Sequence, residues 1–124
     1  MSKSISKTPL KITVEGVGEA PGEFVRFLSP LTVEALLKML PFEGRAHPIV
    51  DGTSFIIGIR RGGEKGTRSV KAGTIAYWPM QDAMCIFYAD TQPYGPVNIV
   101  GNVTGNLDVF RDLKSGVKIR IEKS

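Results

Sequence analysis

Hydrophobic and polar residues alternate near both ends of the chain. Residues 10–14 read Leu-Lys-Ile-Thr-Val, and residues 117–121 read Val-Lys-Ile-Arg-Ile. A period of two places one side of an extended segment in a core and the other side in solvent. We therefore expect a half-buried β-strand near each end of the domain, with a second short strand at 24–28 that pairs with the first as a hairpin.

Two segments predict helices, over residues 30–40 and 106–114. The first begins at Ser29-Pro30. Serine is a favoured N-cap, and proline suits the first helical position because a backbone N–H there would have no acceptor within the helix. The second is bounded by Asn106, a candidate cap, and by Gly116, which can adopt the left-handed conformation at a helix end. Apolar residues recur at i, i+3, i+4 and i+7 in the first helix, at Val33, Leu36, Leu37 and Leu40.

The middle of the chain reads as a series of short strands. Asp51-Gly52 is a favoured two-residue hairpin turn, and Arg60–Gly66 is a polar, glycine-rich segment that we expect at another hairpin tip. Residues 83–88 form an uninterrupted apolar run, which is typical of a strand buried on both faces. Val97–Val100 is a further strand, and we expect Gly101 to end it.

These elements predict a mainly β fold with about eight strands and two short helices. The strands come in runs and do not alternate regularly with helices, which favours an antiparallel sheet. Many short strands in one small domain can close into a barrel, and closure removes exposed strand edges. We therefore expect a closed eight-stranded barrel over residues 9–124 with a helix at each open end, preceded by a flexible tail at 1–8.

Length and composition are those of one globular domain. The chain has 124 residues, 42% of them hydrophobic, which is enough for a core without disulfides. No apolar run approaches the roughly 18 residues that a membrane span needs, and the first eight residues lack the apolar segment of a secretory signal. We expect a cytoplasmic protein with no membrane partner.

A single cysteine and a single histidine restrict the possible chemistry. Cys85 alone excludes an internal disulfide and a cysteine-based zinc cluster, and His47 alone excludes a multi-histidine metal site. We expect Cys85 to be a buried, unreactive side chain and His47 to be a partly exposed strand residue. The sequence predicts no catalytic residue, no metal and no cofactor.

The net charge of +4 comes in part from one basic segment. Its arginines and lysines are candidates for an anion or nucleic-acid site, because clustered cations attract phosphate. The alternative, which we favour, is a solvated loop tip, and we expect no nucleic-acid partner. The candidate residues are Arg60, Arg61, Lys65 and Arg68, with Glu64 among them.

Aromatic residues gather in the segment from Tyr77 to Tyr94, and several of them flank predicted loops. Aromatic side chains beside loops often line ligand pockets. The candidate ligand-binding residues are Trp78, Phe87, Tyr94 and Phe55.

Local motifs resemble the small prokaryotic cyclophilin-like family of unknown function. The motifs are Gly-Thr-Ile-Ala-Tyr-Trp-Pro at 73–79 leading to Ala-Met-Cys-Ile-Phe at 83–87, and Val-Asn-Ile-Val-Gly at 97–101 followed by Gly-Asn-Leu-Asp at 105–108. The order of predicted elements is also similar to that of true cyclophilins. The resemblance covers roughly residues 10–122 and implies an eight-stranded closed barrel capped by two helices.

True cyclophilins are prolyl isomerases, in which an arginine donates a hydrogen bond to the prolyl nitrogen of the twisted amide. The resemblance places Pro48 at that arginine, and Val97 and Gln92 near two other pocket residues of cyclophilins. It thus implies a non-catalytic module that binds an extended peptide or a small apolar ligand. One alternative is a weak prolyl isomerase that uses Arg45 or Arg60 as donor, and another is the anion or nucleic-acid binder described above.

Overall fold

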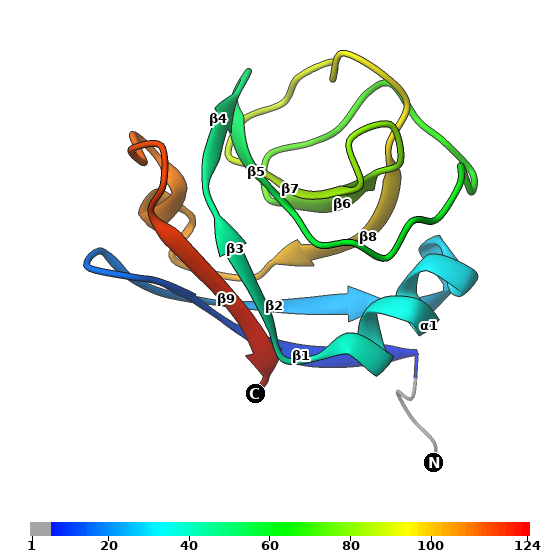
Figure 1. Cartoon of the computed structure of the whole chain (residues 1–124), viewed down its shortest axis with the longest axis horizontal. Coiled ribbons are helices and arrows are strands. Elements are labelled where there is room, and N and C mark those ends of the chain that lie inside the picture. Colours follow the sequence, from blue (N-terminus) through cyan, green and yellow to red (C-terminus); the bar gives the residue numbers. More distant parts are fainter. Residues whose placement is uncertain (1–5) are drawn as a thin grey trace.

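One antiparallel β-sheet forms the framework of the protein and curls into a nearly closed barrel (Figure 1). The structure is a computed structural model that describes residues 6–124. The predicted mainly β class is confirmed, but the sheet within these residues has nine strands and not eight. In their order across the sheet, the strands are β3 (Phe42–Arg45), β9 (Lys118–Lys123), β1 (Lys7–Val14), β2 (Gly18–Val25), β8 (Asn98–Val103), β6 (Thr74–Trp78), β7 (Ala83–Phe87), β5 (Gly52–Ile56) and β4 (His47–Ile49).

The barrel closes through one chain segment that changes its partner at Ala46. Before Ala46, β3 pairs with β9; after it, β4 pairs with β5. Ala46 itself is held by two backbone bonds, from its N–H to the carbonyl of Val117 and from the N–H of Gly116 to its own carbonyl. The same segment therefore forms both edges of the sheet, which explains the additional strand.

The predicted first helix is confirmed as α1 (Pro30–Met39), which buries Val33 and Leu36. Ser29 is the N-cap and Pro30 opens the helix, as predicted, but the Ser29 side chain makes no capping bond. Its hydroxyl donates instead to the carbonyl of Ile99 in β8 at 2.8 Å. The chain before α1 also differs from the prediction. Residues 26–28, expected in a strand, form a short 3-10 helix, η1 (Arg26–Leu28).

The predicted second helix is wrong. Only a single 3-10 turn forms there, η2 (Leu107–Phe110), which buries Val109 and Phe110. Asn106 adopts a left-handed conformation (φ 52°), and its side-chain amide donates to the carbonyl of Glu19 at 2.7 Å rather than to the helix start. The chain is already extended at Arg111, so the helix ends after this one turn although the apolar spacing in the sequence continues to Leu113.

Two predicted hairpins differ from the structure. The turn between β4 and β5 consists of Val50 and Asp51, so Gly52 lies in β5 and not in the turn. Residues 57–73 form a long irregular loop and not a hairpin, since the only bridges within it join Thr67 to Val97 and Val70 to Thr91. The polar and glycine-rich composition of residues 60–66 predicted the tip of a hairpin. In the structure, the loop instead pairs with a second loop, at residues 88–97.

The two long loops explain why β7 is buried on both faces, as predicted. Inward side chains of β6 and β7 join the barrel core, whereas Cys85 and Phe87 face outward. Val70 and Val97, from residues 57–73 and 88–97, pack over these outward side chains, and Figure 1 shows both loops circling β6 and β7. Cys85 is fully buried, as predicted, and burial raises its thiol pKa to about 12, which disfavours the reactive thiolate.

The first and last strands, β1 and β9, show how the predicted ends of the domain agree with the structure. β1 begins at Lys7, so its first two residues fall within the predicted tail at 1–8, and residues 1–5 lie outside the described residues. β9 confirms the predicted strand at the other end. Within residues 6–124, no helix has the length and hydrophobicity needed to cross a lipid bilayer.

Candidate functional site

Two adjoining cavities lie beside β4, where the chain has just changed partner. The first has a volume of about 600 Å³ and the second about 500 Å³. Both are lined by His47, Trp78 and Gln81, so we treat them together as the β4 groove. The groove therefore combines side chains from β4, from the end of β6 and from the β6–β7 turn, which only the folded barrel brings together.

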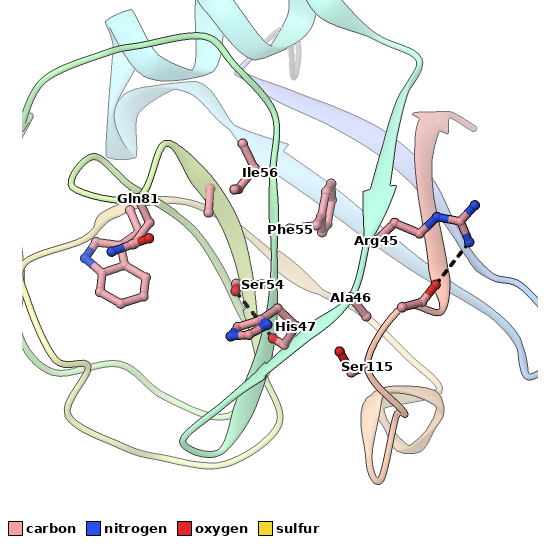
Figure 2. Close-up of a pocket in the computed structure, with 11 residues that line it drawn as sticks. Arg45, Ala46, His47, Ser54, Phe55, Ile56, Gln81 and Ser115 are labelled. Carbon is pink, nitrogen blue, oxygen red and sulfur yellow. Dashed lines mark hydrogen bonds between the residues drawn. The ribbon is translucent and has the colours of Figure 1, made fainter.

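One end of the groove is polar. Arg45 and Ser115 line the first cavity there, and the Arg45 Nη1 donates to the carbonyl of Gly116 at 3.1 Å. Ser54 lies opposite His47 in the β4–β5 register, and its hydroxyl donates to the His47 carbonyl at 3.4 Å. Figure 2 shows the His47 imidazole on the side of the groove where Gln81 lies, while Arg45 extends the other way to its bond with Gly116.

The other end of the groove is aromatic. Tyr94 lines the second cavity, and its side chain is 75% exposed. The indole Nε1 of Trp78 is buried, has no hydrogen-bond partner within residues 6–124, and lies 3.4 Å from the point where a Cβ on Gly95 would sit. The part of the Trp78 ring that lines the groove is therefore carbon, suited to apolar or stacking contacts.

Exposed apolar side chains lie along the groove. Of the large hydrophobic residues exposed within the described chain, four lie at the groove or beside it in the β6–β7 turn. Exposed apolar side chains gathered at a concave site favour an interaction site, because their contact with water is unfavourable. The four residues are Val50, Ile56, Met80 and Tyr94.

The structure brings three of the four predicted ligand-binding residues together. Trp78 and Tyr94 line the groove, and Phe55 lines its first cavity while packing inward against Phe42 at a ring distance of 6.3 Å. Phe87 does not line either cavity; it is 1% exposed and belongs to the outer core cluster. Its apolar strand is the signal that indicates a core residue.

Sequence reasoning missed part of the groove. His47 is an exposed strand residue, as predicted, but its place between two cavities follows only from the β4–β5 pairing. Gln81 is a polar residue in a turn and carries no recognisable signal in the sequence. Pro48, which the resemblance aligns with the cyclophilin arginine, lines the second cavity, and Arg45 is the one arginine among the lining residues of the groove.

The basic residues predicted as an anion site do not converge on the groove. Arg60 and Arg61 line a separate cavity of about 260 Å³ that also includes Glu64. Lys65 donates through Nζ to the carbonyl of Phe27 at 3.0 Å. Arg68 is exposed elsewhere on the loop, so these cations share a segment of chain but not one pocket.

The loop that carries these cations is anchored at the barrel. The Tyr77 hydroxyl donates to Asp82 Oδ1 at 2.6 Å, and the same carboxylate oxygen accepts the N–H of Arg60 at 2.9 Å. Burial, together with the Asp82 carboxylate, raises the pKa of Tyr77 to about 12, so the phenol keeps its proton. Elsewhere, no group of three His, Cys, Asp or Glu side chains within residues 6–124 is arranged to hold a metal ion.

Solved structures share this fold. A hypothetical protein from Archaeoglobus fulgidus, known from its solution structure, superposes with a TM-score of 0.80 and 22% identity over the whole of both chains. McbB, solved in complex with tryptophan, superposes with a TM-score of 0.78 and 16% identity over 93% of this chain and 44% of its own length. Identities this low show a common fold alone.

Sequence comparison gives the family. No curated protein matches the sequence. The family model described as Cyclophilin-like matches residues 8–122, which is nearly the whole chain and includes every strand that lines the groove. The protein therefore belongs to the cyclophilin-like family.

Proposed function

We propose that the protein is a non-catalytic binding module and that the β4 groove is its binding site. The ligand is a planar apolar group, carried by a small molecule or by the side chain of an extended peptide. The observation that carries this proposal is the set of exposed apolar side chains around a concave site lined by Trp78 and Tyr94. Pockets that combine aromatic walls with a few polar groups are typical ligand sites.

The polar groups of the groove support binding and do not favour catalysis of prolyl isomerisation. Isomerisation is accelerated only by contacts that are stronger in the twisted amide than in the planar one. Pro48 has no side-chain donor for such a contact. Arg45 carries the guanidinium of the groove, but it lines the first cavity and not the second, where Pro48 and Tyr94 lie.

McbB gives limited further support. This fold occurs within a protein that was solved with a bound aromatic amino acid. The present chain spans less than half of McbB, so the likeness supports only the compatibility of the fold with an aromatic ligand.

The proposal can be tested through Trp78, which is the single tryptophan of the chain. Neutral aromatic probes, 3-phenylpropionamide and the peptide acetyl-Ala-Phe-amide, are titrated while Trp78 fluorescence is recorded. We expect saturable changes, and we expect Tyr94→Ala to weaken binding several-fold by removing one wall of the groove.

Phe27→Ala is the matched control. Phe27 is also an exposed aromatic residue, at 61%, but it lies in η1 and lines neither cavity. Its removal should leave the affinity at the wild-type value. An absence of saturable change with both probes, or an equal loss in the two variants, would contradict the proposed site.

A further inference from the structure

We infer that the natural ligand of the β4 groove carries a carboxylate joined to its aromatic group. This inference rests on the proposed function and adds the charge of the ligand. Arg45 and His47 line the groove, and no Asp or Glu is among its lining residues. A groove with the Arg45 guanidinium and the Ser115 hydroxyl at one end and aromatic rings at the other complements an anionic aromatic molecule.

Arg45 has donors to spare for such a ligand. A guanidinium has five N–H donors in a planar fork, and the only side-chain hydrogen bond of Arg45 within residues 6–124 is the one from Nη1 to Gly116. Arg45 also forms no ion pair with these residues. A carboxylate can accept two parallel bonds from such a fork, which gives both affinity and orientation. The Ser115 hydroxyl lines the same cavity and can add a further donor.

The carboxylates nearest in sequence are engaged elsewhere. Glu43, two residues before Arg45, pairs with Lys118 at 3.5 Å and with Arg120 at 3.2 Å. Asp82, next to Gln81, accepts bonds from Tyr77 and from the backbone of Arg60. Within residues 6–124 no carboxylate pairs with Arg45, and an anionic ligand would supply a counter-ion.

The shared chemistry is a carboxylate attached to an aromatic group, which occurs in small aromatic acids and at the C-terminus of a peptide that ends in an aromatic residue. Two matched pairs separate these sources. The first is 3-phenylpropionate against 3-phenylpropionamide, and the second is acetyl-Ala-Phe with a free carboxylate against its amide. Binding is followed by Trp78 fluorescence and by the single indole N–H signal in the NMR spectrum.

We expect the acid of at least one pair to bind about tenfold more tightly than its amide, as charge-assisted hydrogen bonds do. Arg45→Gln should bring the acid down to the affinity of the amide. Arg68→Gln removes the same charge from an exposed loop residue outside the groove and should leave the preference in place. Should Arg45→Gln fail to fold, Arg45→Lys keeps the charge without the fork and should reduce the preference.

The outcomes distinguish the carboxylate inference from the proposed function. Equal affinities for acid and amide, with Tyr94→Ala still weakening both, would overturn the carboxylate inference and leave the proposed function standing. An equal loss of preference in the Arg45 and Arg68 variants would also overturn it, because the effect would then come from overall charge. No binding in either pair would overturn the inference and the proposed function together.

Discussion

Gly101 is the position where two strands approach too closely for a side chain. A Cβ at Gly101 would overlap the carbonyl oxygen of Glu23 and lie 3.0 Å from the Cα of Phe24, both in β2. The register between β6 and β8 also shifts next to it, between Ile75 and Ala76. Glycine inside a strand often marks such close contact. The prediction that Gly101 ends its strand is therefore wrong: Gly101 lies inside β8 and allows this strand to run between β2 and β6.

We expect Gly101→Ala to lower the free energy of unfolding by at least about 1–3 kcal/mol, the usual cost of forcing a methyl group into a packed site. Gly63→Ala is the matched control, because a Cβ there meets no atom within 4 Å and Gly63 has no positive φ. That variant should stay within about 0.5 kcal/mol of wild type. Chemical denaturation measures both; equal stability of the two variants would refute the close approach.

At the scale of single elements, α1 depends on a residue distant in sequence. The Glu64 carboxylate accepts the N–H of Leu31 at 2.9 Å, and the N–H and hydroxyl of Thr32 at 2.8 Å each. Glu64 is held in place by the buried Asn98, whose side-chain oxygen accepts the Glu64 N–H at 2.8 Å. An acidic group at a helix start satisfies free N–H donors and interacts favourably with the helix dipole. These bonds therefore connect the loop at residues 57–73 to the first turn of α1.

This contact predicts a pH-dependent stability. Burial by itself raises the pKa of Glu64, but the bonds from Leu31 and Thr32 outweigh burial and leave the pKa below its ordinary value of 4.5. A carboxyl whose pKa is lowered by folding stabilises the protein above that ordinary value, and this contribution disappears as the pH falls through the folded-state pKa. We expect Glu64→Gln to lower stability by about 0.5–2 kcal/mol at pH 7, as the loss of a helix cap does.

The measurement is the free energy of unfolding of both proteins from pH 7 to pH 3. The difference between them should shrink below about pH 4.5. Glu43 also has a lowered pKa, because of Lys118 and then Arg120, but it is present in both proteins and cancels in the comparison. Glu15→Gln, in the exposed β1–β2 turn, should show no such difference at any pH, and a pH-independent gap for Glu64→Gln would refute the cap.

At the scale of the whole molecule, closure of the barrel creates the groove. The segment that closes the sheet leaves β9 at Ala46 and joins β5, and the groove lies beside this change of partner. Residues separated by about 70 positions, Arg45 and Ser115, line one cavity as a result. The site is therefore a property of the curled sheet as a whole and not of any single strand.

We expect no meaningful acceleration of cis/trans exchange at X-Pro bonds. A pocket that binds the planar and the twisted amide equally leaves the barrier of about 18–20 kcal/mol in place. A protease-coupled assay on an Ala-Pro peptide, with a true cyclophilin as positive control, measures this. Clear acceleration would contradict the non-catalytic proposal. Arg45→Ala would then be the first variant to test and Arg60→Ala the second, since Arg45 lines the groove and Arg60 lines another cavity.

Much of the framework follows from the sequence alone. Four local patterns each predict an observed element, because the spacing of apolar residues shows which face of the element is buried. They are the alternation at residues 10–14 and 117–121, the apolar run at 83–88 and the helical spacing at 30–40. The motifs at 73–79 and 97–101 also indicated the cyclophilin-like family. Each of these signals lies within a few consecutive residues, so it can be recognised without knowing the tertiary structure.

The tertiary structure decided the rest, because those features depend on partners far away in sequence. Residues 106–114 look helical, but Val109 and Phe110 join the barrel core from a single turn, and the chain is extended again at Arg111. The glycine-rich segment after β5 looks like a hairpin tip, but its bridges are to a second loop. His47 and Gln81 carry no signal of their own. They lie at one groove only because β5 and β7 lie between β4 and β6 in the curled sheet, which brings β4 near the β6–β7 turn.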